Sequence, residues 1–300
     1  MAERVSSGPP LTAFMFMALG ATGLTLGDFF IKKSAMAGVS VATLLVFAAP
    51  FTLVALVLLS HFQGGIRHHL EPRSPSKLLI RALLLLVMSW LNITSLSLNP
   101  YAQHAMLFQL SPVFVVIIGA VVMGERISTG VLVALLACLC GTWLILDPGV
   151  HGISLTLLLA IAAALSNATT NSFVAANRGA ATPLGFTFWA VLGVTIIVLI
   201  YWLLFERAVP PLAAQLWIQL SAGFAVTGIV LASAAMQLAN GNTGKVGIML
   251  YVQMPVALVL GWLAFGEQPP TLAILGGVLI ALSGAAISLM GRYQRIGKAA

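Results

Sequence analysis

Apolar runs of about 20 residues alternate with short polar connections along most of the chain. A helix of this length can cross the hydrocarbon core of a bilayer. The pattern therefore predicts an all-α integral membrane protein with ten transmembrane helices. We expect these helices at Leu11–Ile31, Val39–Ser60, Leu78–Leu98, Tyr101–Met123, Ser128–Leu146, Ile153–Ala176, Leu184–Phe205, Ala213–Ala239, Lys245–Phe265 and Thr271–Met290.

One stretch of the sequence occurs twice, at Gln109–Leu146 and at Gln253–Leu289. Each copy has an apolar helix with an early proline and a Gly-Glu end, followed by a second apolar helix that carries a glycine. The proline pair (Pro112 and Pro255) and the glycine pair (Gly141 and Gly284) are 143 residues apart, and the Gly-Glu pair is 142 apart.

This repeat predicts how the chain is divided. Residues 11–147 would form a first five-helix repeat and residues 148–291 a second, between a cytoplasmic N-terminal tail at 1–10 and a basic cytoplasmic tail at 292–300. Because five is an odd number of crossings, the second copy must enter the membrane upside down. The prediction is an inverted repeat, a design found in many secondary transporters.

Composition and charge support a membrane protein and suggest its orientation. Hydrophobic residues make up 60% of the chain and charged residues only 7%, which excludes a soluble globular protein of this size. With the N-terminus in the cytoplasm, 11 of the 14 Lys and Arg residues lie inside, as the positive-inside rule requires. No basic run with interleaved aromatics appears, so we expect no nucleic-acid partner. Cys138 and Cys140 share one apolar helix but point to different faces, so we expect neither a disulfide nor a metal site, and no cofactor.

The repeated segments SPVFVVIIGAVVMGERIS and QMPVALVLGWLAFGEQPP resemble the EamA-type repeats of the drug/metabolite transporter superfamily. The pattern of Arg81, then LSLNPYA at 96–102, then Pro112 resembles them too. The resemblance extends from about Thr12 to Met290. It implies ten helices in two inverted five-helix repeats around a central cavity, with the first, third and fourth helices of each repeat lining it and the fifth helices peripheral. Many relatives carry an arginine in the second helix, where this chain reads Val46-Phe47-Ala48, so a substrate role of that arginine is not carried over.

Two ionisable side chains stand out inside the predicted helices, and such groups are costly enough in a membrane to be functional candidates. Asp28 either pairs with Lys32 one turn later or faces the cavity as a carboxylate that binds a proton or an amine. Its counterpart in the second repeat is Asn171. His104 is either hydrogen-bonded at a helix start or forms a titrating pair with Asp28 for proton coupling.

Other polar and aromatic positions recur on the same helix faces in both repeats. They predict two polar vestibules that meet near the bilayer midplane, although each residue alone could instead serve helix packing. The predicted substrate-binding set is Asp28, Trp90, Thr94, His104, Phe108, Gln109, Asn167, Asn171, Gln237 and Tyr251. Pro112 and Pro255 should break the hydrogen-bond ladder mid-helix and act as gating bends. We interpret Glu125 and Glu267 mainly as structural groups that reach solvent or cap the following helix.

These groups favour a secondary transporter that works by alternating access. Amides, hydroxyls, aromatics, one acid and one histidine suit a neutral, zwitterionic or amine-bearing solute better than a phosphate. The resemblance favours export of an amino acid or related metabolite, driven by a proton gradient or by the solute's own gradient. No GxxxxGK[ST] motif is present, which excludes a self-contained ATP pump.

The alternatives are an uptake carrier for a cofactor-like or methyl-donor metabolite and a non-transporting receptor or structural membrane protein. One acid and one histidine do not make an intramembrane enzyme. The expected partners are the small-molecule solute and membrane lipid, in a monomer or a homodimer. The expected location is a bacterial inner membrane with both termini cytoplasmic.

Overall fold

A computed structural model of the chain describes residues 10–123, 129–146, 154–177, 180–238 and 246–290. Every regular element in these residues is a helix, as the hydrophobic pattern predicts. The first half contains α1 (Leu11–Met36), α2 (Val41–Phe62), α3 (Ile66–Leu70), α4 (Pro75–Leu98), α5 (Tyr101–Phe108), α6 (Ser111–Met123) and α7 (Thr129–Leu146). The second half contains α9 (Leu155–Ala176), α10 (Pro183–Tyr201), the π-helix η1 (Trp202–Glu206), α11 (Leu212–Leu238), the 3₁₀-helix η2 (Ile248–Val252), α13 (Gln253–Phe265) and α14 (Thr271–Met290).

Seven helical segments of the described residues are long and apolar enough to cross a membrane. The apolar parts of α7, of η2 with α13, and of α14 are shorter, at Leu132–Ile145, Met249–Phe265 and Thr271–Ala286. The protein is therefore an integral membrane protein built from apolar helices. That these segments make ten crossings stays a prediction.

Two predicted helices are interrupted near their prolines. The fourth is divided into α5 and α6 at Gln109 and Leu110, and the ninth begins as the 3₁₀-helix η2 before it continues as α13. Both predicted helices are thus interrupted at the prolines, and Pro112 and Pro255 each lie in the first turn of the second piece. Proline lacks an N–H and crowds the preceding turn, so it is tolerated best where a helix begins. The interruption therefore precedes the proline.

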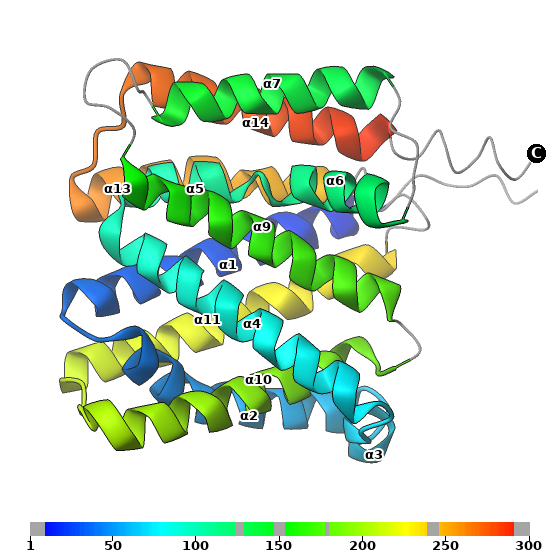
Figure 1. Cartoon of the computed structure of the whole chain (residues 1–300), viewed down its shortest axis with the longest axis vertical. Helices are drawn as coiled ribbons and strands as arrows, with labels where there is room; N and C mark the ends of the chain where they lie inside the picture. The colour runs from blue at the N-terminus through cyan, green and yellow to red at the C-terminus, as the bar shows by residue number, and fades with distance from the viewer. Residues whose placement is uncertain (1–9, 124–128, 147–153, 178–179, 239–245, 291–300) are drawn as a thin grey trace, which may run out of the picture.

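The helices form layers across the molecule (Figure 1). The pair α7 and α14 lies at one edge, next to α5, α6 and α13, and the pair α2 and α10 lies at the opposite edge, with α1, α4, α9 and α11 between them. Glycines allow the closest helix contacts. A Cβ added to Gly141 of α7 would lie 2.7 Å from the carbonyl oxygen of Gly276 in α14, and one added to Gly20 of α1 would lie 2.9 Å from that of Gly228 in α11. The fifth helices are thus peripheral, as the resemblance implies.

Helices at equivalent positions in the two halves have equivalent neighbours in the other half. The first helix of the first half, α1, packs on α11, the third long helix of the second half; equally, α9 packs on α4. The pairs α2 with α10 and α7 with α14 each join equivalent helices. The contacts between halves therefore run along most of the molecule.

Candidate functional site

A buried polar network surrounds the turn between α4 and α5. The side-chain amide of Asn99 donates to the carbonyl oxygen of Ser95 (3.0 Å), to its hydroxyl (3.0 Å) and to the carbonyl oxygen of Thr156 in α9 (2.8 Å). The Ser95 hydroxyl also lies 2.9 Å from His104 Nδ1. Asn99 precedes Pro100, which favours extended backbone and so ends α4 at this point. The turn thus connects α4, α5 and α9 through side chains.

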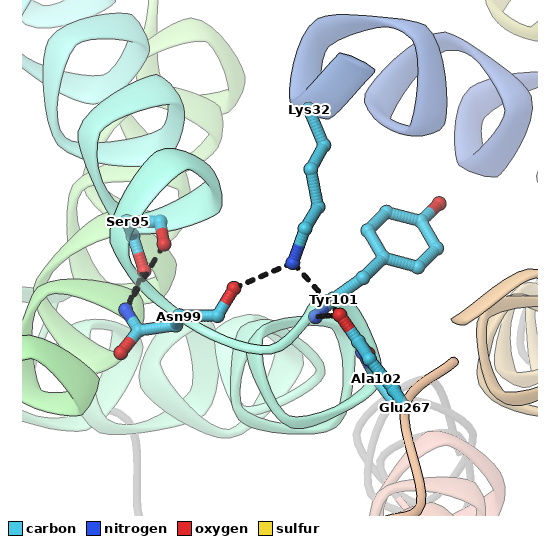
Figure 2. Close-up of polar contacts among 6 residues, drawn as sticks. All are labelled: Lys32, Ser95, Asn99, Tyr101, Ala102 and Glu267. Atoms are coloured by element: carbon cyan, nitrogen blue, oxygen red, sulfur yellow. Dashed lines mark hydrogen bonds and ion pairs between the residues drawn. The ribbon is translucent and has the colours of Figure 1, made fainter. Parts of the chain in front are cut away.

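The same turn binds a buried ion pair (Figure 2). Lys32 Nζ donates to the Asn99 carbonyl oxygen (2.7 Å) and to Glu267 Oε1 (2.8 Å). The Glu267 carboxylate accepts hydrogen bonds from the backbone N–H groups of Tyr101 (2.6 Å) and Ala102 (3.0 Å). These N–H groups open α5 and have no partner within the helix, and the positive end of the helix dipole also favours a carboxylate. Only 8% of the Lys32 side chain and 13% of that of Glu267 are exposed.

This ion pair corrects two interpretations of the sequence. Glu267 neither reaches solvent nor caps the following helix α14, because its carboxylate caps α5 in the other half of the chain. Lys32 pairs with Glu267, and no ion pair between Lys32 and Asp28 is found in the described residues. Glu125 lies outside the described residues.

Asp28 and His104 have separate environments. The Asp28 carboxylate interacts with the Asn92 side chain of α4. The His104 ring is 1% exposed and stacks on Phe108, with 5.8 Å between ring centroids. Its Nδ1 is bonded to Ser95, while its Nε2 is buried and has no hydrogen-bond partner among the described residues. His104 is thus hydrogen-bonded near a helix start, and its pairing with Asp28 stays a proposal.

A second polar group joins the two helix interruptions. Gln109 Nε2, from the break between α5 and α6, donates to the carbonyl oxygen of Leu250 in η2 (3.2 Å) and lies 3.4 Å from Gln253 Oε1. Nearby, Asn167 of α9 donates to the hydroxyl of Ser111, the first residue of α6 (2.9 Å). Asn171, which is exposed, donates to Asn167 Oδ1 (3.4 Å). Amide groups of both halves therefore meet where the helices are interrupted.

The remaining predicted site residues are dispersed. Trp90 packs on the α2–α10 pair, with its ring edge-to-face with that of Tyr201 at 6.1 Å. Thr94 is partly buried in α4. The Tyr251 hydroxyl lies against Gly284 of α14, where a Cβ would come within 1.5 Å of it. Gln237 belongs to α11, but its side chain is outside the described part of the structure.

Sequence reasoning missed Gln253 as a member of these groups, and it missed the pairing of Lys32 with Glu267. Gln253 could have been found, because it precedes Pro255 as Gln109 precedes Pro112 in the repeated stretch. The pairing of Lys32 with Glu267 gave no local signal, since 235 residues separate them.

A cavity of about 340 Å³ lies at the predicted outer end, between the α1–α2 and η1–α11 connections. Glu206 in its wall accepts hydrogen bonds from the hydroxyls of Ser40 and Thr43 at the start of α2. None of the predicted substrate-binding residues lines this cavity. It is therefore separate from the polar groups at the helix breaks.

Comparisons with known proteins agree with this architecture. The model of the EamA-like transporter family matches the chain twice, over residues 11–147 and 154–289. Among 27 matching chains of solved structures is a crystal structure of a protein with 18% sequence identity and a TM-score of 0.63, covering 93% of this chain and 98% of that chain. At this identity the likeness shows the fold alone. No curated protein matches the sequence.

Proposed function

Because this chain belongs to the EamA-like transporter family, whose members move small solutes across membranes, we propose that it exports an amino acid or a related metabolite. The observation that carries the proposal is the meeting of amide groups at the two helix breaks, where Gln109 bonds to Leu250 and approaches Gln253. Amides offer both donors and acceptors without net charge. Such groups suit a zwitterionic solute, whose opposite charges need both kinds of partner.

The mechanism that we propose is alternating access between two inverted five-helix repeats, made of ten membrane crossings. Its support is the packing pattern, which is the same when the halves are exchanged, since α1 packs on α11 as α9 packs on α4. Rocking of one half against the other would change the contacts at the helix breaks. The solute would then face one side of the membrane at a time.

We also propose that a proton drives export and that Asp28 binds it. A carboxylate within a membrane helix is costly and is retained mainly where it functions. Asp28 interacts with Asn92 and not with Lys32, so Lys32 does not neutralise it. His104, whose Nε2 is buried without a partner among the described residues, would be the second titrating group.

The test is a solute screen in proteoliposomes with an imposed pH gradient. We expect the wild-type protein to accumulate at least one labelled amino acid above protein-free liposomes, and the orientation of the gradient that drives it gives the direction. Asp28→Asn should abolish the dependence on the pH gradient while solute counterflow persists, and Glu71→Gln, at an exposed loop position, serves as the control. Transport of no amino acid or amine would disprove the proposed substrate class, and an intact pH dependence in Asp28→Asn would disprove its role.

A further inference from the structure

Arg81 is a cation in a membrane-spanning segment, and it forms no ion pair within the described part of the chain. It lies in α4, within the span Pro75–Leu98, and its side chain is partly buried. Its Nε and Nη1 atoms are buried and have no hydrogen-bond partner among the described residues. Buried guanidinium groups are otherwise paired, because an unpaired charge in an apolar environment is unfavourable. The site is therefore suited to an anion.

The position of Arg81 follows from the packing of α4 against α9. The two helices are antiparallel, since Asn99 contacts Thr156 at one end while Leu78 packs with Phe173 and Val174 at the other. Arg81, one turn after Leu78, therefore lies at the depth of the C-terminal part of α9.

That part of α9 carries an amide path toward the centre of the molecule. Asn171 is exposed there and donates to Asn167, which donates to Ser111 beside the break between α5 and α6. A polar route thus leads from the depth of Arg81 to the amides at the helix breaks. The predicted orientation puts Arg81 at the cytoplasmic end of this route.

Arg81 also shares a face of α4 with the group that interacts with Asp28. Asn92 is eleven residues further along, which is close to three full turns of an α-helix. Asn92 interacts with the carboxylate of Asp28 on α1. The same face of α4 therefore presents a cation near its inner end and meets an acid of α1 further out. None of the acids among the described residues forms an ion pair with Arg81.

We propose that Arg81 binds the carboxylate of the transported amino acid on the cytoplasmic side. A guanidinium donates two parallel N–H bonds to a carboxylate, and a single arginine suits a carboxylate better than a phosphate, which would need several. This inference rests on the proposed function, because it names the part of the solute that this side chain recognises. Arg81 would then select amino acids over amines that lack the carboxylate.

The first experiment compares an amino acid carried by the wild type with the amine obtained by removing its carboxylate, as competitors in liposomes of phosphatidylcholine, which has no net charge. Arg81→Gln should weaken competition by the amino acid roughly 10- to 100-fold, as expected for loss of a charge-assisted hydrogen bond, while competition by the amine stays within about twofold. Arg81→Lys, which keeps the charge but loses the paired N–H groups, should fall between. Arg73→Gln, at an exposed position before α4, should behave as the wild type.

Three outcomes would overturn the inference. Equal weakening for amino acid and amine indicates a structural role, no change excludes any role, and a change seen only with phosphatidylglycerol present assigns the site to anionic lipid. A second readout works even if the wild type carries no amino acid, a result that counts against the proposed function. In purified protein, alanine or acetate should protect Arg81 from modification by phenylglyoxal, followed by mass spectrometry, whereas ethylamine should not. Absence of protection by both carboxylates overturns the site.

Discussion

At the scale of single residues, Glu267 shows how a buried carboxylate is stabilised in this protein. Two backbone N–H groups at the start of α5 and the Lys32 ammonium donate to it at distances between 2.6 and 3.0 Å. Each charge has an opposite charge beside it, and further hydrogen bonds satisfy the remaining atoms, which is the condition under which a buried ion pair is tolerated. The pair joins α1 and α5 of the first half to the α13–α14 connection of the second.

Removing either partner of this pair should destabilise the protein. Lys32→Met and Glu267→Gln should each cost on the order of 3 kcal/mol, because the remaining group is left buried without its partner. In the double variant the loss should be smaller than the sum of the single losses. Thermal unfolding in detergent, followed by tryptophan fluorescence, measures the three midpoints.

Lys33→Met is the matched control for this cycle. Lys33 has no ion pair among the described residues and lies over the rings of Phe29 (5.3 Å) and Trp217 (5.5 Å), so its loss should be smaller. Strictly additive losses for Lys32 and Glu267 would show that the two side chains act independently and would contradict this account.

The functional candidates that the sequence alone identifies are polar residues whose immediate neighbours in the chain are apolar. Asp28 and His104 were identifiable because a polar side chain within an apolar run is conspicuous. The partner of Lys32 was not, because the i,i+4 spacing to Asp28 is visible in the sequence whereas Glu267 is 235 residues away. From the sequence, Arg81 is part of the pattern that resembles the EamA-type repeats, but its lack of a partner among the described residues is a property of the packed structure.

At the scale of elements, glycines set the distance between α1 and α11. A Cβ on Gly228 would lie 2.8 Å from the carbonyl oxygen of Gly20 and 2.9 Å from the backbone nitrogen of Leu24. Backbone atoms cannot rotate away, so Gly228→Ala should push the helices apart and cost roughly 1–3 kcal/mol. Detergent thermal unfolding and retention of a single gel-filtration peak measure the effect.

Gly223→Ala on the same helix is the control. A Cβ there would lie at an ordinary contact distance of 3.7 Å from the Phe51 ring. Alanine has a higher helix propensity than glycine, so this change should be neutral or should stabilise by up to about 1 kcal/mol. Equal losses at the two positions would contradict the role of close backbone contact.

The prolines at the helix breaks give the prediction for gating. Pro112→Ala restores an N–H that can donate to the carbonyl oxygen of Phe108, so α5 and α6 can join into one helix. If the break serves the change of access, the maximal transport rate should fall several-fold while the KM stays within about twofold, and Pro255→Ala should act alike. Pro50→Ala is the control, because Pro50 lies inside α2, which is continuous from Val41 to Phe62. Equal transport by Pro112→Ala and Pro50→Ala would leave the break without a gating role.

Helices were predicted well wherever long apolar runs define them, and less well where polar contacts shape the backbone. The helix breaks were expected from the prolines but lie just before them. The π-helix η1 was missed. It ends at Glu206, whose carboxylate accepts hydrogen bonds from the hydroxyls of Ser40 and Thr43 at the start of α2, and these contacts are not visible in the sequence. The short helix α3 was also missed, because its connection is polar and shows no helical hydrophobic period.

At the scale of the whole molecule, the composition alone predicted a membrane protein, and the outward faces agree. On α7, for example, Leu132, Leu136, Leu139 and Trp143 are exposed, as lipid contact requires. The number of membrane crossings was harder to predict, since some helices are short or interrupted. For example, α13 can cross the bilayer only together with the preceding η2. The relative orientation of the two halves depends on this number. If an even number of crossings separates a loop of the first half from the equivalent loop of the second, both loops lie on the same side of the membrane and the repeats are parallel.

Labelling of two equivalent loop positions decides between parallel and inverted repeats. Gln63 follows α2 and Ala208 follows α10 and η1, and both are exposed. In a background with Cys138→Ala and Cys140→Ala, a membrane-impermeant maleimide should label Ala208→Cys in right-side-out vesicles and Gln63→Cys only after the vesicles are opened. The basic residues that follow Gln63 in its connection, such as Arg67 and Arg73, favour the cytoplasm for that loop.

Labelling of both cysteines from the same side would mean an even number of crossings between them. The halves would then be parallel, and rocking of two inverted repeats could not be the transport mechanism.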